Sequence, residues 1–531
     1  MHRIQQLTCT ADEAIARIPD GATVACGGFA GSAHPEALTS ALERRFLASG
    51  TPNGLTLVYG AGQGDRDSRG LNHLGYAGLV RRVIGGHYGL APRIGRLVLS
   101  NQIEAYNFPQ GVMCQLYRDI AAGRPGCITH VGLGTFVDPD FGGGRLNALT
   151  TEPLVERIEL SGRTWLFYKA FPIHVALIRA TSADPFGNLS MEEEVVIGEI
   201  LPMAQAVRNS GGIVLAQVKR LLDHPTPPVQ VRVPGILIDH VVVASAKDHE
   251  QSYAEPRNET HYQPASKDAA VASFNSVGTL PWDERRIIAA RACDELMPGA
   301  IANLGIGMPE GIARIAAERG LLDHVTLTVE SGPIGGMPVG GLSFGASVHP
   351  QAIIDQPAQF DFYDGGGLDF AALGAAQVDR HGNVNVSKFG TRLAGSGGFI
   401  NISQNAKRLV FCGTLTSGCL EVAIEGYKLR IVTEGSEKKF VSDVEHLTFS
   451  GSVAQQNHHE VLYVTERAVF RLTQEGIELI EVAPGIDVET QVLAQMEFRP
   501  IIRDVKPMPK HLFGDGGGKN RKQSEPVVLV R

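Results

Sequence analysis

The hydrophobic and polar positions of this chain fall into short blocks that predict a helix, a stop and then a strand. In the first block, Thr10 and Glu13 fit a capping box that opens a short amphipathic helix, and Pro19-Asp20-Gly21 ends it. The apolar run over residues 22–26 then predicts a strand that leads into Gly27-Gly28-Phe29. Helices and strands that alternate in this way are typical of α/β folds.

The same order of events returns in the second half of the chain. Asp283 is placed to cap a helix over residues 284–296, which Pro298-Gly299 ends. Residues 300–304 predict a strand, and this strand also runs into glycines, in Gly305-Ile306-Gly307. The pattern therefore indicates an internal duplication.

A second match between the halves needs no gaps. Residues 167–188 and 362–383 are identical at seven of 22 aligned positions, and both segments end in Asp-x-x-Gly-Asn. Chance similarity of two α/β segments is the alternative explanation. With the duplication, the predicted fold class is α/β, with two fused, related open α/β domains whose sheets are mainly parallel.

Composition along the chain predicts the domain boundaries. A chain of 531 residues is too long for one core, so two domains are expected. Residues 246–281 are polar and non-periodic, which favours a linker between an N-terminal domain over 1–245 and a C-terminal domain over 282–513. Residues 514–531, which begin with a run of glycines, indicate a tail.

Charge and composition narrow the class of partner. The chain is 43% hydrophobic and 20% charged, as in ordinary globular proteins, and its net charge of −8 offers no basic surface for nucleic acid or an anionic membrane. No apolar run approaches the ~18 residues of a membrane span. The start of the chain also lacks the hydrophobic region of a signal peptide, so we expect a cytoplasmic protein that contacts no membrane.

Cysteine and histidine spacing argues against a metal centre. The seven cysteines are scattered, odd in number and without a Cys-x-x-Cys pair, which disfavours both a disulfide framework and a structural zinc site. None of the 17 histidines stands in His-x3-His or His-Glu-x-x-His spacing. We therefore expect no metal, and cysteines that serve as small buried hydrophobic residues.

Glu330 is the residue with the clearest chemical signal. It ends the apolar, β-branched run over 325–329 and opens a glycine-rich turn over 331–341. A carboxylate at the end of a strand, beside backbone that carries few side chains, is placed to attack a carbonyl group as a nucleophile. The alternative is a carboxylate that caps the turn or pairs with an arginine.

Two further glycine turns are candidates for ligand binding. Gly395-Ser396-Gly397-Gly398 offers bare amides that suit an oxyanion or a phosphate, and a strand-like segment over 399–402 follows it. Gly60-Ala61-Gly62-Gln63-Gly64 follows a predicted strand over 55–59, but it lacks the third-glycine spacing and the apolar helix of a dinucleotide fingerprint. We therefore expect no NAD or FAD site.

The segment from Thr328 to Gly336, with Glu330 near its start, resembles the family I CoA-transferases, and specifically the long single-chain type that includes bacterial acetate and propionate CoA-transferases. The likeness extends over nearly the whole chain, through Gly27-Gly28-Phe29, residues 303–309, Gly397-Gly398 and residues 481–487. It implies a fused pair of open α/β domains and a homodimer or homotetramer.

The resemblance also implies a reaction and a set of site residues. Glu330 would form a glutamyl-CoA thioester, and Gln115 and the backbone amide of Gly398 would be the oxyanion-hole donors. The loops that meet CoA and substrate would include Gly27, Gly28, Asn303, Gly305, Gly307 and Gly397. The implied function is ping-pong transfer of CoA from an acyl-CoA to a short-chain carboxylic acid. Coenzyme A is then a substrate and covalent intermediate, and no cofactor is permanently bound.

Two other functions stay open at the level of sequence. An acyl-CoA hydrolase would use the same Glu330, with water in place of the carboxylate acceptor. A non-catalytic sensor of CoA or a sugar phosphate would bind its ligand without any covalent change at Glu330. Mass balance for the acceptor separates the two enzymes, and covalent labelling of Glu330 separates both from the sensor.

Overall fold

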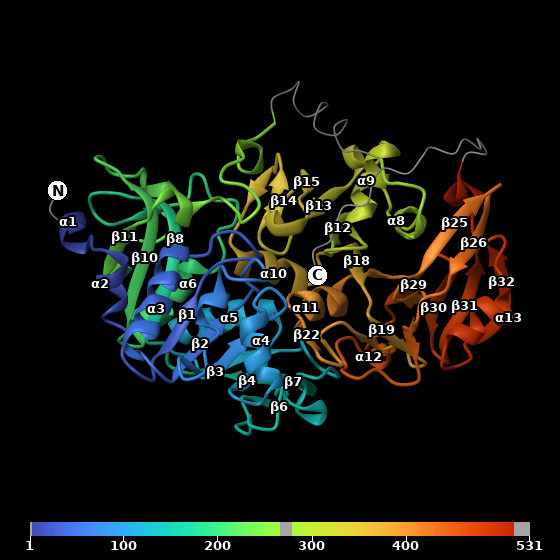
Figure 1. The fold of residues 1–531 in the computed structure, drawn as a ribbon, viewed down its shortest axis with the longest axis horizontal. Helices are drawn as coiled ribbons and strands as arrows, with labels where there is room; N and C mark the ends of the chain where they lie inside the picture. The colour runs from blue at the N-terminus through green and yellow to red at the C-terminus, as the bar shows by residue number, and fades with distance from the viewer. Residues whose placement is uncertain (1–2, 266–278, 515–531) are drawn as a thin grey trace.

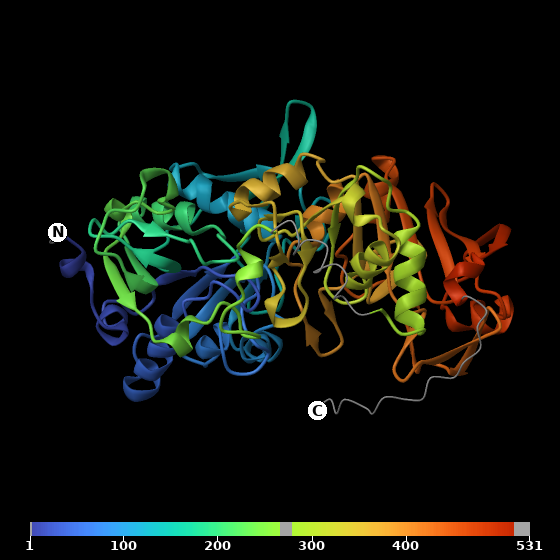
Figure 2. The same cartoon turned by 90° about the horizontal axis from the view of Figure 1, so that it is seen from above.

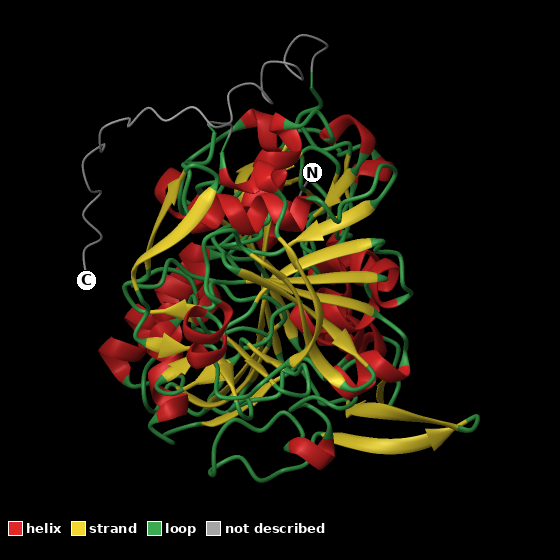
Figure 3. Cartoon of the chain, turned by 90° about the vertical axis from the view of Figure 1, so that its right-hand side faces the viewer, coloured by secondary structure: helices red, strands yellow, loops and turns green. Residues whose placement is uncertain are grey.

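The computed structural model of the protein describes residues 3–265 and 279–514. Its N-terminal and C-terminal halves lie side by side along the long axis, and each is built around one β-sheet (Figure 1). Seen from the end, strands cross the middle of the molecule and helices lie outside them (Figure 3). Both sheets are mainly parallel, so the predicted α/β fold class is confirmed. The exact domain boundaries stay a prediction.

The sheet of the N-terminal half is parallel along its main path, in the order β11-β10-β8-β1-β2-β3-β4. The strands are β1 (Thr23–Cys26), β2 (Leu55–Tyr59), β3 (Val80–Gly85), β4 (Glu104–Asn107), β8 (Val175–Ala183), β10 (Ile213–Leu221) and β11 (His240–Val243). Parallel neighbours need crossover connections, most of which are helical here. The main helices are α3 (Glu36–Ser49), α4 (Pro92–Leu99), α5 (Gln110–Ala121) and α6 (Ile200–Asn209).

The sheet of the C-terminal half has the order β17-β14-β13-β12-β18-β23-β29-β30-β31-β32. Its parallel centre consists of β12 (Ile301–Leu304), β13 (Thr326–Thr328), β18 (Phe370–Gly374), β23 (Arg408–Cys412) and β29 (Glu460–Val464). The flanking strands are β14 (Pro333–Ile334), β17 (Ala352–Ile353), β30 (Ala468–Thr473), β31 (Gly476–Val482) and β32 (Ile501–Pro507). The main helices are α8 (Glu284–Cys293), α9 (Glu310–Glu318), α10 (Gln356–Asp364) and α11 (Phe399–Asn405).

Five strands hold equivalent places in the two sheets. The order β11-β10-β8-β1-β2 in the first sheet corresponds to β29-β23-β18-β12-β13 in the second, with the same order along the chain. The matched Asp-x-x-Gly-Asn segments also fold alike. Asp184 Oδ1 accepts from the amide of Asn188 at 2.9 Å, and Asp379 Oδ1 accepts from the amide of Asn383 at 3.0 Å. These shared features support duplication over chance similarity.

The predicted helix starts are present in the structure. Thr10 and Glu13 form the capping box of α2 (Ala11–Ile15), and the Asp283 side chain accepts from the amide of Arg286 at the start of α8. The strand-like segment over 399–402 is instead the first turn of α11, because the amide of Ile402 donates to Gly398 O at 3.0 Å. All four residues of this segment are buried, so the burial pattern cannot distinguish a strand from a helix.

The predicted linker packs against both halves where it is described. Tyr253 OH donates to Glu36 Oε2 at 2.7 Å, and the hydroxyl oxygens of Ser252 and Ser343 lie 2.7 Å apart. Residues 266–278 of the linker and 515–531 of the predicted tail lie outside the described residues. A hairpin of β6 (Val155–Leu160) and β7 (Arg163–Lys169), which forms a small sheet with β5 (Gly126–Thr129), projects from the N-terminal half (Figure 2).

Candidate active site

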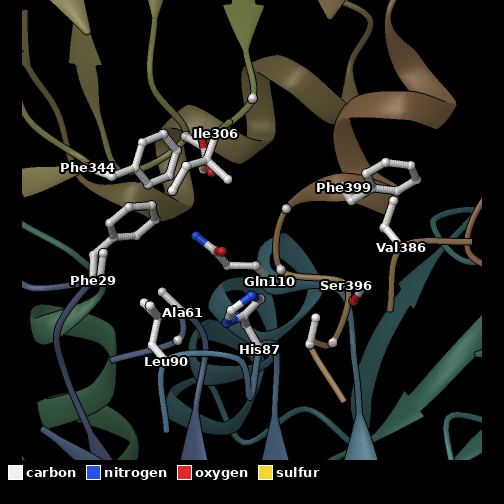
Figure 4. Close-up of a pocket in the computed structure, with 18 of the residues that line it drawn as sticks. Phe29, Ala61, His87, Leu90, Gln110, Ile306, Phe344, Val386, Ser396 and Phe399 are labelled. Carbon is white, nitrogen blue, oxygen red and sulfur yellow. The ribbon is translucent and has the colours of Figure 1, made fainter. Parts of the chain in front are cut away.

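A cavity of about 320 Å³ lies between the two halves. Phe29, which follows β1, and Phe344, from the second half, form part of its wall with ring centroids 5.7 Å apart. Gln110 projects between Ile306 on one side and Leu90 on the other (Figure 4). The lining residues follow the carboxyl ends of parallel strands in both sheets, which is where open α/β folds bind ligands.

Glu330 follows β13 closely and lines this cavity, with 9% of the residue exposed. Its Oε2 accepts one long hydrogen bond, 3.4 Å from Asn303 Nδ2, and the same nitrogen lies 3.3 Å from Thr328 O. Within the described residues no lysine, arginine or histidine pairs with Glu330, so the interpretation as a salt-linked turn residue has no support.

Burial raises the pKa of Glu330 above the usual value for a glutamate, and its own backbone amide and Asn303 offset this only in part. In a desolvated site, a carboxylate with few hydrogen bonds is less stabilised as an anion. It is therefore a better nucleophile than a solvated carboxylate. The geometry therefore fits an attacking group.

The turn over 395–398 brings bare backbone against this carboxylate. A Cβ atom on Gly398 would lie 3.5 Å from Glu330 Cγ and 3.2 Å from Phe360 Cζ. Gly398 is the N-cap residue of α11, and in the described part of the chain its amide donates to no protein group. Gly397 N donates to Gly86 O at 2.7 Å and fastens the turn to the first half.

Gln110, a residue that the sequence analysis missed, also lines the cavity and is a candidate for a second donor. It opens α5 with 2% exposure, and its backbone amide donates to Gly397 O at 2.9 Å. Its Nε2 is buried and has no partner within residues 3–265 and 279–514. The signal was present in the chain, because Pro109-Gln110 follows the end of β4, an edge at which α/β proteins place functional side chains.

The structure does not support Gln115 as an oxyanion donor. Its Nε2 donates to Pro357 O at 3.3 Å and to the Asp361 carboxylate, and it does not line the cavity. Gln115 lies five residues beyond Gln110 on α5, about 140° around the helix, so it faces α10. The two glutamines therefore cannot reach the same group, and Gln110 is the better candidate.

The remaining predicted loop residues divide into two groups. Asn303, Gly305 and Gly397 line the cavity. Gly27, Gly28 and Gly307 do not line it: Gly27 packs near Ile200, Gly28 lies against Gln63, and Gly307 is exposed with its amide bonded to Glu310. The resemblance therefore led to loops at the strand ends, but it did not distinguish the glycines that line the cavity from those that do not.

A second buried carboxyl group, Glu199, lies behind the cavity wall. It is fully buried, and neither oxygen has a hydrogen-bond partner in the described residues. A Cβ atom on Gly60, beside the lining residue Ala61, would lie 3.1 Å from Glu199 Oε1. Burial raises the pKa of Glu199 from 4.5 to about 7, so this side chain is largely protonated below neutrality.

Glu199→Gln is expected to stabilise the protein above pH 7 and to change little at pH 5. A raised pKa in the folded state gives stability that is present below pH 4.5 and lost as pH rises through 7. The full difference is about 3 kcal/mol. Thermal unfolding at pH 5 and pH 8 measures it, with the exposed Glu489→Gln as control. An equal shift at both pH values would contradict the assignment.

The sequence analysis also predicted unpaired cysteines, no metal site and no membrane span. All seven cysteines are free: five are buried, Cys9 is half-buried and Cys419 is exposed, so the expectation of burial is wrong for Cys419 and holds only in part for Cys9. Within the described residues no three histidine, cysteine or acidic side chains are grouped to hold a metal ion. Among the described helices, none combines the length and the apolar character needed to cross a bilayer.

This pair of open α/β halves, with a buried glutamate between bare backbone turns, is the arrangement expected of a family I CoA-transferase, and comparison with known proteins shows that the chain belongs to that family. The Coenzyme A transferase family profile matches residues 8–244. The chain is an enzyme of this class, as expected from the resemblance.

Three relatives illustrate the match. Acetate CoA-transferase YdiF of Escherichia coli K12 is 44% identical over 510 residues, covering 95% of each chain. Caffeate CoA-transferase of Acetobacterium woodii is 44% identical over 513 residues, covering 95% of this chain and 97% of the relative. The crystal structure of YdiF from E. coli O157:H7, described as a thioester complex with CoA, superposes with a TM-score of 0.90 at 42% identity and 96% coverage of both chains.

Proposed function

We propose that the protein transfers CoA from an acyl-CoA to a short-chain carboxylic acid through a glutamyl-CoA thioester on Glu330. The observation that carries this proposal is a buried glutamate that has no cationic partner in the described residues and lies beside the Gly398 backbone in a cavity between two domains. The YdiF thioester complex, a structure with the same fold at 42% identity, supports a covalent intermediate.

The first half-reaction begins at the Glu330 carboxylate. One carboxylate oxygen attacks the thioester carbonyl, and the C–S bond breaks as CoA leaves as a thiolate, which gives a mixed anhydride. The thiolate then attacks the glutamyl carbonyl of this anhydride. The acid departs as a carboxylate, and Glu330 carries CoA as a thioester.

The second half-reaction is the reverse with a new acid. The incoming carboxylate attacks the glutamyl thioester and expels the thiolate, and the thiolate attacks the acyl carbonyl of the resulting anhydride. Glu330 is released as a carboxylate. One thioester replaces another, so no nucleotide is consumed.

Gln110 and Gly398 are the proposed oxyanion donors. Each tetrahedral intermediate places a full negative charge on oxygen, and preorganised N–H donors in a desolvated site stabilise that charge strongly. The Gln110 side-chain amide and the Gly398 backbone amide are both unpartnered in the described residues, and both residues line the cavity that contains Glu330. A position between the two halves also shields the anhydride and the thioester from water.

The acceptor assay tests this function directly. Incubation with acetyl-CoA and propionate is expected to give propionyl-CoA and acetate in equal amounts, with no net release of free CoA. Release of free CoA at the same rate with or without propionate would instead identify the hydrolase. Labelled propionate distinguishes the two outcomes by following the carbon into the thioester.

Three further properties belong to the proposal. Phe29 and Phe344 form an apolar part of the cavity wall, which favours an acyl chain that carries no charge close to the thioester. The family resemblance supports a homodimer or homotetramer. A cytoplasmic location is supported by seven cysteines that are all in the free state.

A further inference from the structure

The cavity opens between loops of the two halves, and Arg66 lies at this opening. Arg66 lines the cavity and is exposed. Ile306 and Gly341, which belong to the C-terminal half, also line the cavity and are exposed. Ala61 and Leu90, which flank the Arg66 loop, lie on the side of Gln110 opposite Ile306 (Figure 4). These three exposed lining residues mark where a ligand longer than the cavity is expected to extend.

The backbone holds Arg66 in an uncommon conformation. Its φ is +71°, in the left-handed region that residues other than glycine seldom occupy. The turn is fixed by Asp65, whose Oδ1 accepts from the amides of Asp67 at 2.8 Å, Ser68 at 2.9 Å and Arg69 at 3.0 Å. The Arg66 amide donates to Leu90 O at 3.1 Å. Strained residues held by their surroundings in this way gather at ligand sites.

The Arg66 guanidinium makes no hydrogen bond or ion pair within the described residues. By contrast, the side chain of Arg69, three residues later in the chain, has partners within the protein. It pairs with Glu250 at 2.8 Å and lies over the Tyr253 ring at 4.2 Å. The same loop therefore carries one arginine with a structural partner and one whose donors point to no protein acceptor.

Among the described residues that line the cavity, Arg66 is the one positively charged side chain that could pair with an anionic ligand. Among the described lining residues, Glu330 is the one acid and Arg66 the one arginine or lysine. His87 is neutral near pH 7, because burial, together with the nearby Arg66, lowers its pKa from 6.5 to about 4. In a protein of net charge −8, an anionic group needs a local cation, and a guanidinium suits polyoxygen anions.

We infer that Arg66 binds a second anionic group of the reactants, either phosphate oxygens of the CoA moiety or a further carboxylate on the acid. This inference rests on the proposed function, since it takes the cavity to hold an acyl-CoA. A volume of about 320 Å³ is at the small end for ligand sites, so the phosphate-bearing end of CoA extends past the opening. Arg66 lies on that path.

Initial rates of Arg66→Gln with two acceptors test the inference and separate the two sources. If CoA phosphate is the ligand, KM for acetyl-CoA rises about tenfold or more with every acceptor, the scale of one lost charge-assisted contact. If a carboxylate is the ligand, kcat/KM falls about tenfold with succinate and not with propionate. Arg66→Lys keeps the charge and is expected to regain part of either loss.

Arg81→Gln is the matched control, because Arg81 is exposed and does not line the cavity. Its KM for acetyl-CoA and its preference between acceptors are expected to equal those of the wild type. Unchanged KM for acetyl-CoA together with unchanged preference between propionate and succinate overturns the inference. The CoA adduct on Glu330 must still form in Arg66→Gln at saturating acetyl-CoA. Absence of that adduct from the wild type would overturn the proposed function instead, so the two failures are distinguishable.

Discussion

Replacing Glu330 with alanine is expected to abolish CoA transfer, with a loss in kcat on the order of 10⁴-fold or more, the scale seen when a catalytic nucleophile is removed. No second carboxylate lines the cavity among the described residues, so no other side chain there replaces it. Steady-state rates with acetyl-CoA and propionate measure the loss. Glu330→Asp keeps the carboxylate but withdraws it by one methylene, and is expected to keep a small part of the rate.

Glu330→Gln is the control that separates chemistry from folding. The amide has the shape of the carboxyl group and no charge, and burying an uncharged group costs less than burying an ion. This variant is expected to be at least as stable as the wild type, because burial disfavours the Glu330 anion, and as inactive as Glu330→Ala. Turnover within about tenfold of wild type in either variant would contradict a nucleophilic role, since tenfold is only 1.4 kcal/mol.

Gln110→Ala is expected to lower kcat by roughly 10²–10³-fold, or about 2.7 to 4 kcal/mol, as for other lost oxyanion donors. The loss should fall on kcat with little change in KM for acetyl-CoA, because the donor acts on charge that develops during reaction. Gln110→Glu places a second carboxylate near the oxyanion and is expected to lose at least as much.

Gln115→Ala provides the matched comparison on the same helix. Its amide donates to Asp361 and Pro357, away from the cavity, so turnover close to that of the wild type is expected. A large loss of kcat in Gln115→Ala with none in Gln110→Ala would reverse the assignment. Thermal unfolding of both variants identifies any loss that comes from weakened packing between α5 and α10.

Much of the fold was predictable because local signals and the global fold agree. Neighbouring residues in the chain are enough to predict the helix caps at Thr10 and Asp283. The same holds for the strands that lead into Gly27 and Gly305. The segment over 399–402 shows where this fails. Its residues are all buried, so burial shows no period, and the cap at Gly398 that starts the helix depends on contacts with the first half.

The site was predictable only in part, for a related reason. Glu330 is marked by its own neighbours in the chain, a strand before it and glycines after it. Gln110 is marked by a partner 287 positions away, since its amide meets Gly397 O in the other half. The family resemblance implied Gln115 and did not identify Gln110, and the positions of the two residues around α5 distinguish them.

Intact-protein mass spectrometry after brief mixing with acetyl-CoA tests the central claim most directly. The wild type is expected to gain the mass of CoA less one water, and peptide mapping is expected to locate that gain on Glu330. Glu330→Gln is expected to gain nothing, and propionate is expected to remove the adduct from the wild type. An enzyme that turns over without such an adduct, or that carries it on another residue, would contradict the account.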